Sequence, residues 1–181
     1  MDTTSTPFAS AAKAGVYIGL IMVIISLLMY FIDYTILASF WFGIFALILF
    51  FGLILYAGFN FRKANGGFLD YGAAFQFAFV TLIVCGVIST LGNILLYQVI
   101  DPQLPELLVE SQLESMLSMM DGFGAGDNMT GDQLDEMRKG LEANYTLTGQ
   151  LKSFGIGLIL YAILSLILAA IIKKKDTSLD Y

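Results

Sequence analysis

Four long apolar runs dominate the pattern of hydrophobic and polar positions in this chain of 181 residues. The runs cover residues 14–32, 36–59, 71–97 and 154–172. Each is close to or longer than the ~20 residues that a helix needs to cross ~30 Å of hydrocarbon. Lipid offers the backbone no hydrogen-bond partner, so each run must form a helix rather than an open strand. The pattern predicts an all-α, polytopic membrane protein with four transmembrane helices.

The connections between the runs predict that these helices form two antiparallel pairs. Only Asp33, Tyr34 and Thr35 separate the first two runs, so residues 14–59 are expected to form a transmembrane hairpin. A short basic loop leads into the third helix, residues 71–97, and Asp70 can cap that helix through its carboxylate. The other expected segments are an N-terminal segment 1–13, the loop 60–70, an insert 98–153, the fourth helix 154–172 and a tail 173–181.

Basic residues set the expected orientation, because short loops rich in Lys and Arg stay on the cytoplasmic side. The basic residues of the two terminal segments and of the loop 60–70 fall on one predicted face: Lys13, Arg62, Lys63, Lys173, Lys174 and Lys175. The opposite face carries Asp33 and the insert 98–153, which holds ten acidic residues. We therefore expect both termini in the cytoplasm. Arg62, Lys63 and the three tail lysines are expected to contact anionic lipid headgroups.

Composition agrees with a membrane location and excludes several kinds of chemistry. Hydrophobic residues make up 57% of the chain, and the mean hydropathy is +0.79, far above the range of a soluble domain. The sequence contains no histidine, and its single cysteine is Cys85. This excludes most zinc and haem sites, Cys–His nucleophiles and any intramolecular disulfide. We expect no cofactor, metal or nucleic-acid partner, and an external segment without disulfides favours a bacterial inner membrane.

Small and polar residues inside the runs mark candidate helix-packing positions. Ala11, Gly15 and Gly19 recur every four residues and form a smooth strip, which either another helix of the chain or a second subunit could approach. Gln76 and Asn93 carry amides that cost several kcal/mol when unpaired in hydrocarbon, so both need partners. Interhelical hydrogen bonds or a polar path along the third helix would supply them. The candidates for packing or for a path are Gly15, Gly19, Gln76, Ser89, Gly92, Asn93 and Gly157.

The acidic insert predicts a small extracytoplasmic helical hairpin between the third and fourth transmembrane helices. Asp101 followed by Pro102 is typical of a helix start, and Thr130 with Gln133 has the spacing of a capping box at a second start. A glycine-rich linker, residues 121–132, joins the two amphipathic helices. The acidic stripe and the adaptable methionine face of the first helix are candidates for partner binding: Glu106, Glu110, Glu114, Met116 and Met120.

Two motifs flank the third run, and together with the insert they carry a resemblance to a known family. Residues 67–75 read Gly-Phe-Leu-Asp-Tyr-Gly-Ala-Ala-Phe, and residues 96–102 read Leu-Tyr-Gln-Val-Ile-Asp-Pro. With the acidic insert and the ending at residues 169–175, the chain resembles, over nearly its whole length, a Bacteroidota-type family of unknown function. Members of that family are small bacterial integral membrane proteins with four helices. The resemblance implies a bacterial inner membrane location and no particular activity.

The absence of recognisable chemistry, together with the packing motifs, favours a non-enzymatic accessory subunit of a membrane complex. Its expected partners are membrane lipid and either another membrane protein or a second copy of the chain. The alternative is a small channel or carrier with Gln76, Thr81, Ser89 and Asn93 along its path. An intramembrane enzyme ranks third, because no pair of nucleophile and base is visible.

Overall fold

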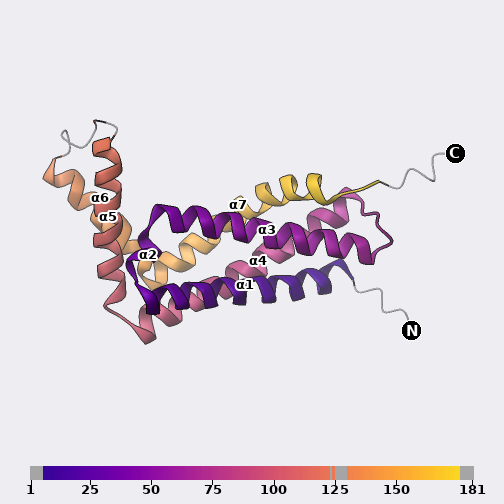
Figure 1. Ribbon diagram of the computed structural model, residues 1–181, viewed down its shortest axis with the longest axis horizontal. Helices are drawn as coiled ribbons and strands as arrows, with labels where there is room; N and C mark the ends of the chain where they lie inside the picture. Colours follow the sequence, from indigo (N-terminus) through magenta and orange to yellow (C-terminus); the bar gives the residue numbers. More distant parts are fainter. Residues whose placement is uncertain (1–5, 123, 125–129, 176–181) are drawn as a thin grey trace. The chain divides into compact units, whose positions relative to one another are not determined.

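The computed structural model describes residues 6–122, 124 and 130–175, and its regular elements are helices (Figure 1). In chain order they are α1 (Pro7–Ile32), α2 (Thr35–Ala38), α3 (Phe40–Ala64), α4 (Tyr71–Leu95), the π-helix η1 (Leu96–Ile100), α5 (Leu104–Gly122), α6 (Gly131–Tyr145) and α7 (Leu147–Ile172). The predicted all-α fold is confirmed. Parts of the terminal segments and most of the predicted linker, residues 123 and 125–129, lie outside the described residues.

Four helices are long and apolar enough to cross a membrane, as predicted: Pro7–Ile32, Phe40–Ala64, Tyr71–Ile100 and Leu147–Ile172. Three of them contain the whole predicted apolar run and extend it, whereas the second begins and ends later than the run 36–59. The first helix begins at Pro7 because proline and alanine residues fit the first turns of a helix. The third continues through η1, and the fourth begins seven residues earlier than expected, since Thr148 and Gln150 do not interrupt it. The expected reversal at residues 33–35 is followed by the short helix α2.

The chain divides into two compact units whose boundaries cut the long helices. The first unit comprises residues 1–22, 48–89 and 154–181, and the second comprises residues 23–47 and 90–153. The first unit therefore contains parts of all four long helices with the loop 65–70. The second contains their remaining parts with α2, α5 and α6.

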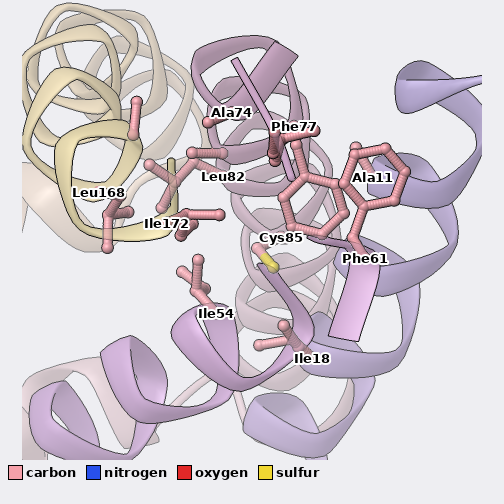
Figure 2. Packing of buried hydrophobic residues seen from close by; sticks show 13 residues of the cluster. Ala11, Ile18, Ile54, Phe61, Ala74, Phe77, Leu82, Cys85, Leu168 and Ile172 are labelled. Atoms are coloured by element: carbon pink, nitrogen blue, oxygen red, sulfur yellow. The ribbon is translucent and has the colours of Figure 1, made fainter. Parts of the chain in front are cut away.

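The core of the first unit gathers side chains from α1, α3, α4 and α7 (Figure 2). Phe61 and Phe77 stack with ring centroids 4.8 Å apart, and Figure 2 shows both rings beside Ala11. Ile54, Leu82 and Ile172 are fully buried in the same cluster. α4 supplies more of the buried residues than any other helix here, so it is the centre of this unit.

α1 and α4 approach each other closely because α1 presents small residues. A Cβ atom at Gly15 would lie 2.7 Å from the Cβ atom of Val84 and 2.9 Å from the carbonyl oxygen of Thr81. At Gly19 it would lie 3.0 Å from the Cβ atom of Ile88. The small-residue strip predicted on α1 is therefore occupied by α4 of the same chain.

Two side chains of α4 add hydrogen bonds to this contact. The Thr81 hydroxyl donates to the carbonyl oxygen of Ala11 at 3.2 Å, and the Cys85 thiol donates to that of Gly15 at 3.3 Å. Both donors are buried. They are one helical turn apart and meet carbonyls that are also one turn apart, so they fix the register of α1 against α4.

α7 packs within the first unit through two further glycines. A Cβ atom at Gly58 of α3 would lie 2.5 Å from the Cδ1 atom of Ile172. One at Gly86 of α4 would lie 2.8 Å from the hydroxyl oxygen of Tyr161. The Tyr71 hydroxyl also donates to the carbonyl oxygen of Leu166 at 3.1 Å. Glycines on α3 and α4 thus leave room for large side chains of α7 to pack against both helices.

The second unit has its own apolar cluster, centred on Leu96, Leu104 and Leu108. α5 packs against both α2 and α6 within this unit (Figure 1). On α5, Leu104, Leu108, Val109 and Leu113 are buried, whereas α6 has no fully buried residue among those described. α5 is therefore the anchored member of the α5–α6 hairpin.

Local capping predictions are confirmed at three helix starts. The Asp70 carboxylate accepts from the backbone N–H of Ala73 at 3.0 Å at the start of α4. Asp101 accepts from the N–H of Leu104 at 3.2 Å and so caps α5, although this helix begins at Leu104 and not at Pro102. The capping box of α6 has both of its hydrogen bonds, between Thr130 and Gln133.

We expect Gly15→Ala to destabilise the bundle by roughly 1–3 kcal/mol, because the added methyl group meets a backbone carbonyl and a branched side chain of α4. Gly52→Ala is the matched control, since a Cβ atom at Gly52 of α3 would meet nothing within 4 Å. The control should leave stability unchanged or raise it by up to about 1 kcal/mol. Thermal unfolding of both variants in the same mild detergent measures the difference. Equal unfolding midpoints would contradict the close packing of α1 on α4.

We expect Thr130→Ala to cost about 1 kcal/mol locally, because it removes the hydroxyl that accepts from the N–H of Gln133. Hydrogen exchange of the first-turn amides of α6 should accelerate about fivefold, while exchange in α5 stays unchanged. Thr148→Ala, at another exposed threonine, is the control. Unchanged exchange at residues 131–134 would show that the capping box contributes nothing to the start of α6.

Candidate interaction sites

The polar residues of α4 that were proposed to line a path have different environments. Thr81 is fully buried against α1, and Ser89 is half-buried. Gln76 is exposed in the first unit, and Asn93 is exposed in the second unit. Within the first unit, Gln76, Thr81 and Ser89 thus differ in their exposure.

The side-chain amides of Gln76 and Asn93 make no hydrogen bond with any described residue. Tyr71 and Tyr97 are aromatic residues of the kind that mark the two membrane interfaces. Gln76 lies five residues along the helix from Tyr71, and Asn93 lies four residues from Tyr97. These separations correspond to about 6–8 Å along the helix axis. Both amides therefore face the surroundings of the bundle at the edge of the apolar span.

The remaining packing candidates have mixed environments. Gly92 faces α1, since a Cβ atom there would lie 2.6 Å from the Cγ2 atom of Val23. The three atoms nearest to such an atom at Gly157 of α7 all belong to Tyr161 on the same helix, and the closest lies at 3.4 Å. Gly92 thus serves the packing of two helices, whereas the nearest neighbour of Gly157 is on its own helix.

Several of the predicted headgroup residues form a junction between the loop 65–70 and the end of α7. The Arg62 guanidinium donates to the carbonyl oxygen of Ile172 at 2.9 Å. Leu69 and Lys174 form an isolated antiparallel bridge in which each backbone N–H donates to the other carbonyl at 2.9 Å. Gly66 and Gly67 make the turn possible with φ of +79° and +85°.

The lysines of this junction lie against aromatic rings. The Lys173 ammonium is 5.5 Å from the ring centroid of Tyr71, and that of Lys174 is 5.6 Å from the ring centroid of Phe68. The three tail lysines and Asp70 line a cavity of about 690 Å³. Lys63 is exposed and is not among the residues that line this cavity. The basic side chains therefore stabilise the junction between the loop 65–70 and the end of α7. They also form a positively charged surface.

The predicted partner-binding face of the α5–α6 hairpin is largely exposed. Glu106, Glu110 and Glu114 are exposed, as is Met116, while Met120 is half-buried. Glu110 forms an ion pair of 3.6 Å with Arg138 of α6. Both partners are substantially exposed, so the pair contributes little to stability. The acidic stripe remains available on the surface of the hairpin.

Tyr145, at the end of α6, is the centre of a polar network that the sequence reasoning missed. Its hydroxyl accepts from the Gln112 amide at 2.7 Å, and its carbonyl oxygen accepts from Gln98 and Gln150 at 3.2 Å each. Its ring meets that of Tyr97 edge-on at 5.1 Å. Burial raises the pKa of Tyr145, and the Gln112 hydrogen bond acts in the opposite direction. The three glutamines were not recognisable as partners, because they come from α5, α7 and η1.

The carboxylates beside the candidate spans accept hydrogen bonds that stabilise the local structure. Asp33 accepts from the Thr35 hydroxyl at 2.7 Å and from its backbone N–H at 2.9 Å, and these bonds lower the pKa of Asp33. Asp101 accepts from the Tyr30 hydroxyl at 3.0 Å besides capping α5. No group of three or more potential metal-ligating His, Cys, Asp or Glu side chains occurs among the described residues.

Comparison with known proteins gives one match. A family model described as "Protein of unknown function (DUF4199)" matches residues 13–174. No curated protein and no solved structure matches significantly. The matched residues include most of α1 and all of the other candidate membrane helices, as well as α5 and α6. The chain belongs to the DUF4199 family of proteins of unknown function.

Proposed function

We propose that this protein is a non-enzymatic accessory subunit that binds another membrane protein or a second copy of itself. The observation that carries the proposal is the pair of exposed amides on α4, Gln76 and Asn93. Neither has a hydrogen-bond partner in the described part of the chain. An unpaired amide near hydrocarbon costs several kcal/mol, whereas a polar group of a neighbouring helix would satisfy it.

Asn93 supports an intermolecular contact more strongly than Gln76. Its side chain is one methylene shorter and reaches the polar interface less easily. The long side chain of Gln76 can extend toward the headgroups from its place near Tyr71. A partner helix lying along the outer part of α4 would bring a hydrogen-bonding group to Asn93.

The α5–α6 hairpin supplies a second surface for a partner, on the extracytoplasmic side in this proposal. The acidic stripe of Glu106, Glu110 and Glu114 complements a basic surface of a partner. The flexible side chain of exposed Met116 can pack against an apolar surface of the same partner. The half-covered apolar face of α6 is consistent with such a partner, since no residue of α6 is fully buried within the described chain.

The proposed location is a bacterial inner membrane with both termini in the cytoplasm. The close association of the loop 65–70 with the lysines after α7 supports this orientation, since it gathers Arg62, Lys173 and Lys174 at one end of the first unit. Short basic segments stay cytoplasmic. The acidic insert would then lie outside.

We expect Asn93→Leu to weaken the assembly between about threefold and thirtyfold, because one interhelical hydrogen bond in a membrane contributes roughly 0.6–2 kcal/mol. Asn60→Leu makes the same chemical change at an exposed asparagine of α3, outside both proposed partner surfaces, and it should leave the assembly unchanged. The measurement is purification of the tagged full-length protein in mild detergent, followed by identification of copurified proteins and the mass of the intact assembly.

The outcomes of this experiment separate the alternatives. A stoichiometric second protein, or a homo-oligomer, that dissociates more readily in Asn93→Leu supports the proposal. A monomer that copurifies with lipid alone would refute it. An assembly equally stable in wild type and Asn93→Leu would exclude the α4 amide as its contact. Thermal unfolding of the monomeric fraction controls for a loss of folding.

A further inference from the structure

An open groove lies between α1 and α3 within the first unit, and its volume is about 770 Å³. This volume falls in the range of cavities that hold small ligands, roughly 300–1,000 Å³. Its inner lining is apolar and includes Ile18 and the stacked rings of Phe61 and Phe77. Ile21 and Leu53 line it farther from the loop 65–70. A water-soluble ligand would find few polar partners in this inner part.

The polar lining residues are concentrated where α1 begins and α3 ends. Lys13 and Asn60 line the groove there, and Tyr17 and Tyr56 lie one turn farther along their helices. All four side chains are exposed. The groove therefore has a polar mouth and an apolar interior, which is the pattern of a site for an amphiphile.

The length of the groove matches the depth of one membrane leaflet. From Lys13 to Ile21 the α1 axis rises about 12 Å at ~1.5 Å per residue. Half of the ~30 Å hydrocarbon thickness is about 15 Å. An acyl chain entering at the level of Lys13 can therefore lie along the groove to near the middle of the bilayer.

Lys13 differs from the cations of the neighbouring junction. Arg62 donates to a backbone carbonyl, and Lys173 and Lys174 lie over aromatic rings. Lys13 makes no ion pair with any residue that the structure describes. A positive charge at the mouth of an apolar groove complements an amphiphile with an anionic head.

We propose that the α1–α3 groove binds one anionic phospholipid. One acyl chain occupies the apolar interior beside Phe61, and the headgroup phosphate pairs with the Lys13 ammonium. The Asn60 amide donates to a phosphate or ester oxygen. This inference does not depend on the proposed accessory function, because it concerns α1 and α3 rather than the exposed amides of α4.

The test is native mass spectrometry of the delipidated full-length protein in mild detergent. Phosphatidylglycerol and phosphatidylcholine with identical acyl chains are titrated separately, and the dissociation constant of the first bound lipid is measured. We expect wild type to bind phosphatidylglycerol at least fivefold more tightly than phosphatidylcholine. Lys13→Gln should weaken this binding about fivefold, since one lysine near an anionic lipid contributes ~1 kcal/mol. Lys63→Gln removes a charge outside the groove lining and should have a smaller effect.

A second pair of variants tests the apolar interior. Ala57→Phe places a ring inside the groove and should abolish the tight binding of the first lipid, whereas Ala170→Phe on the exposed side of α7 should not. Ala14→Leu fills the same groove from α1, and it replaces Ala57→Phe in this test if the latter variant fails to fold. Thermal unfolding identifies folded variants.

Three results would overturn the proposal. One is equal binding of the two phospholipids by wild type, and another is unchanged first-lipid binding in the folded groove-filling variants. Oleate bound as tightly as phosphatidylglycerol would exclude a phospholipid as the preferred ligand. If a second copy or another protein filled the groove instead, Ala57→Phe would dissociate that assembly without changing lipid binding.

Discussion

The close approach of α1 to α4 is the contact on which the first unit depends. In lipid the hydrophobic effect does not drive one helix against another, so association relies on close packing and on hydrogen bonds. Gly15 and Gly19 allow the backbones to approach, and Thr81 and Cys85 then reach backbone carbonyls of α1. With α1 held in this register on α4, its opposite edge is free to form the groove that faces α3.

Features that depend on local sequence could be predicted well. The four apolar runs require helices because unpaired backbone groups cannot remain in hydrocarbon. The caps at Asp70, Asp101 and Thr130 follow from the short-range geometry of side chain and backbone. Helix ends were less predictable, because α7 continues through polar Thr148 and Gln150 and η1 extends the third helix to Ile100.

Features that depend on which faces meet could not be predicted. Thr81 and Cys85 share the spacing of Ala11 and Gly15, but nothing local to either helix pairs the two motifs. Nothing near Arg62 in the sequence indicates that its guanidinium donates to the carbonyl oxygen of Ile172, 110 residues later. The Tyr145 network joins three distant glutamines in the same way. Such contacts are properties of the tertiary arrangement.

The bridge between Leu69 and Lys174 has a consequence for biosynthesis. The two bridged residues are separated by the whole of α4, the α5–α6 hairpin and α7, so the bridge can close only after α7 has been translated. Until then Gly58 and Gly86 lack their contacts with Ile172 and Tyr161. In a chain made from its N-terminus, the packing of α7 against α3 and α4 is therefore the part of the first unit that can form only after the other three helices have been synthesised.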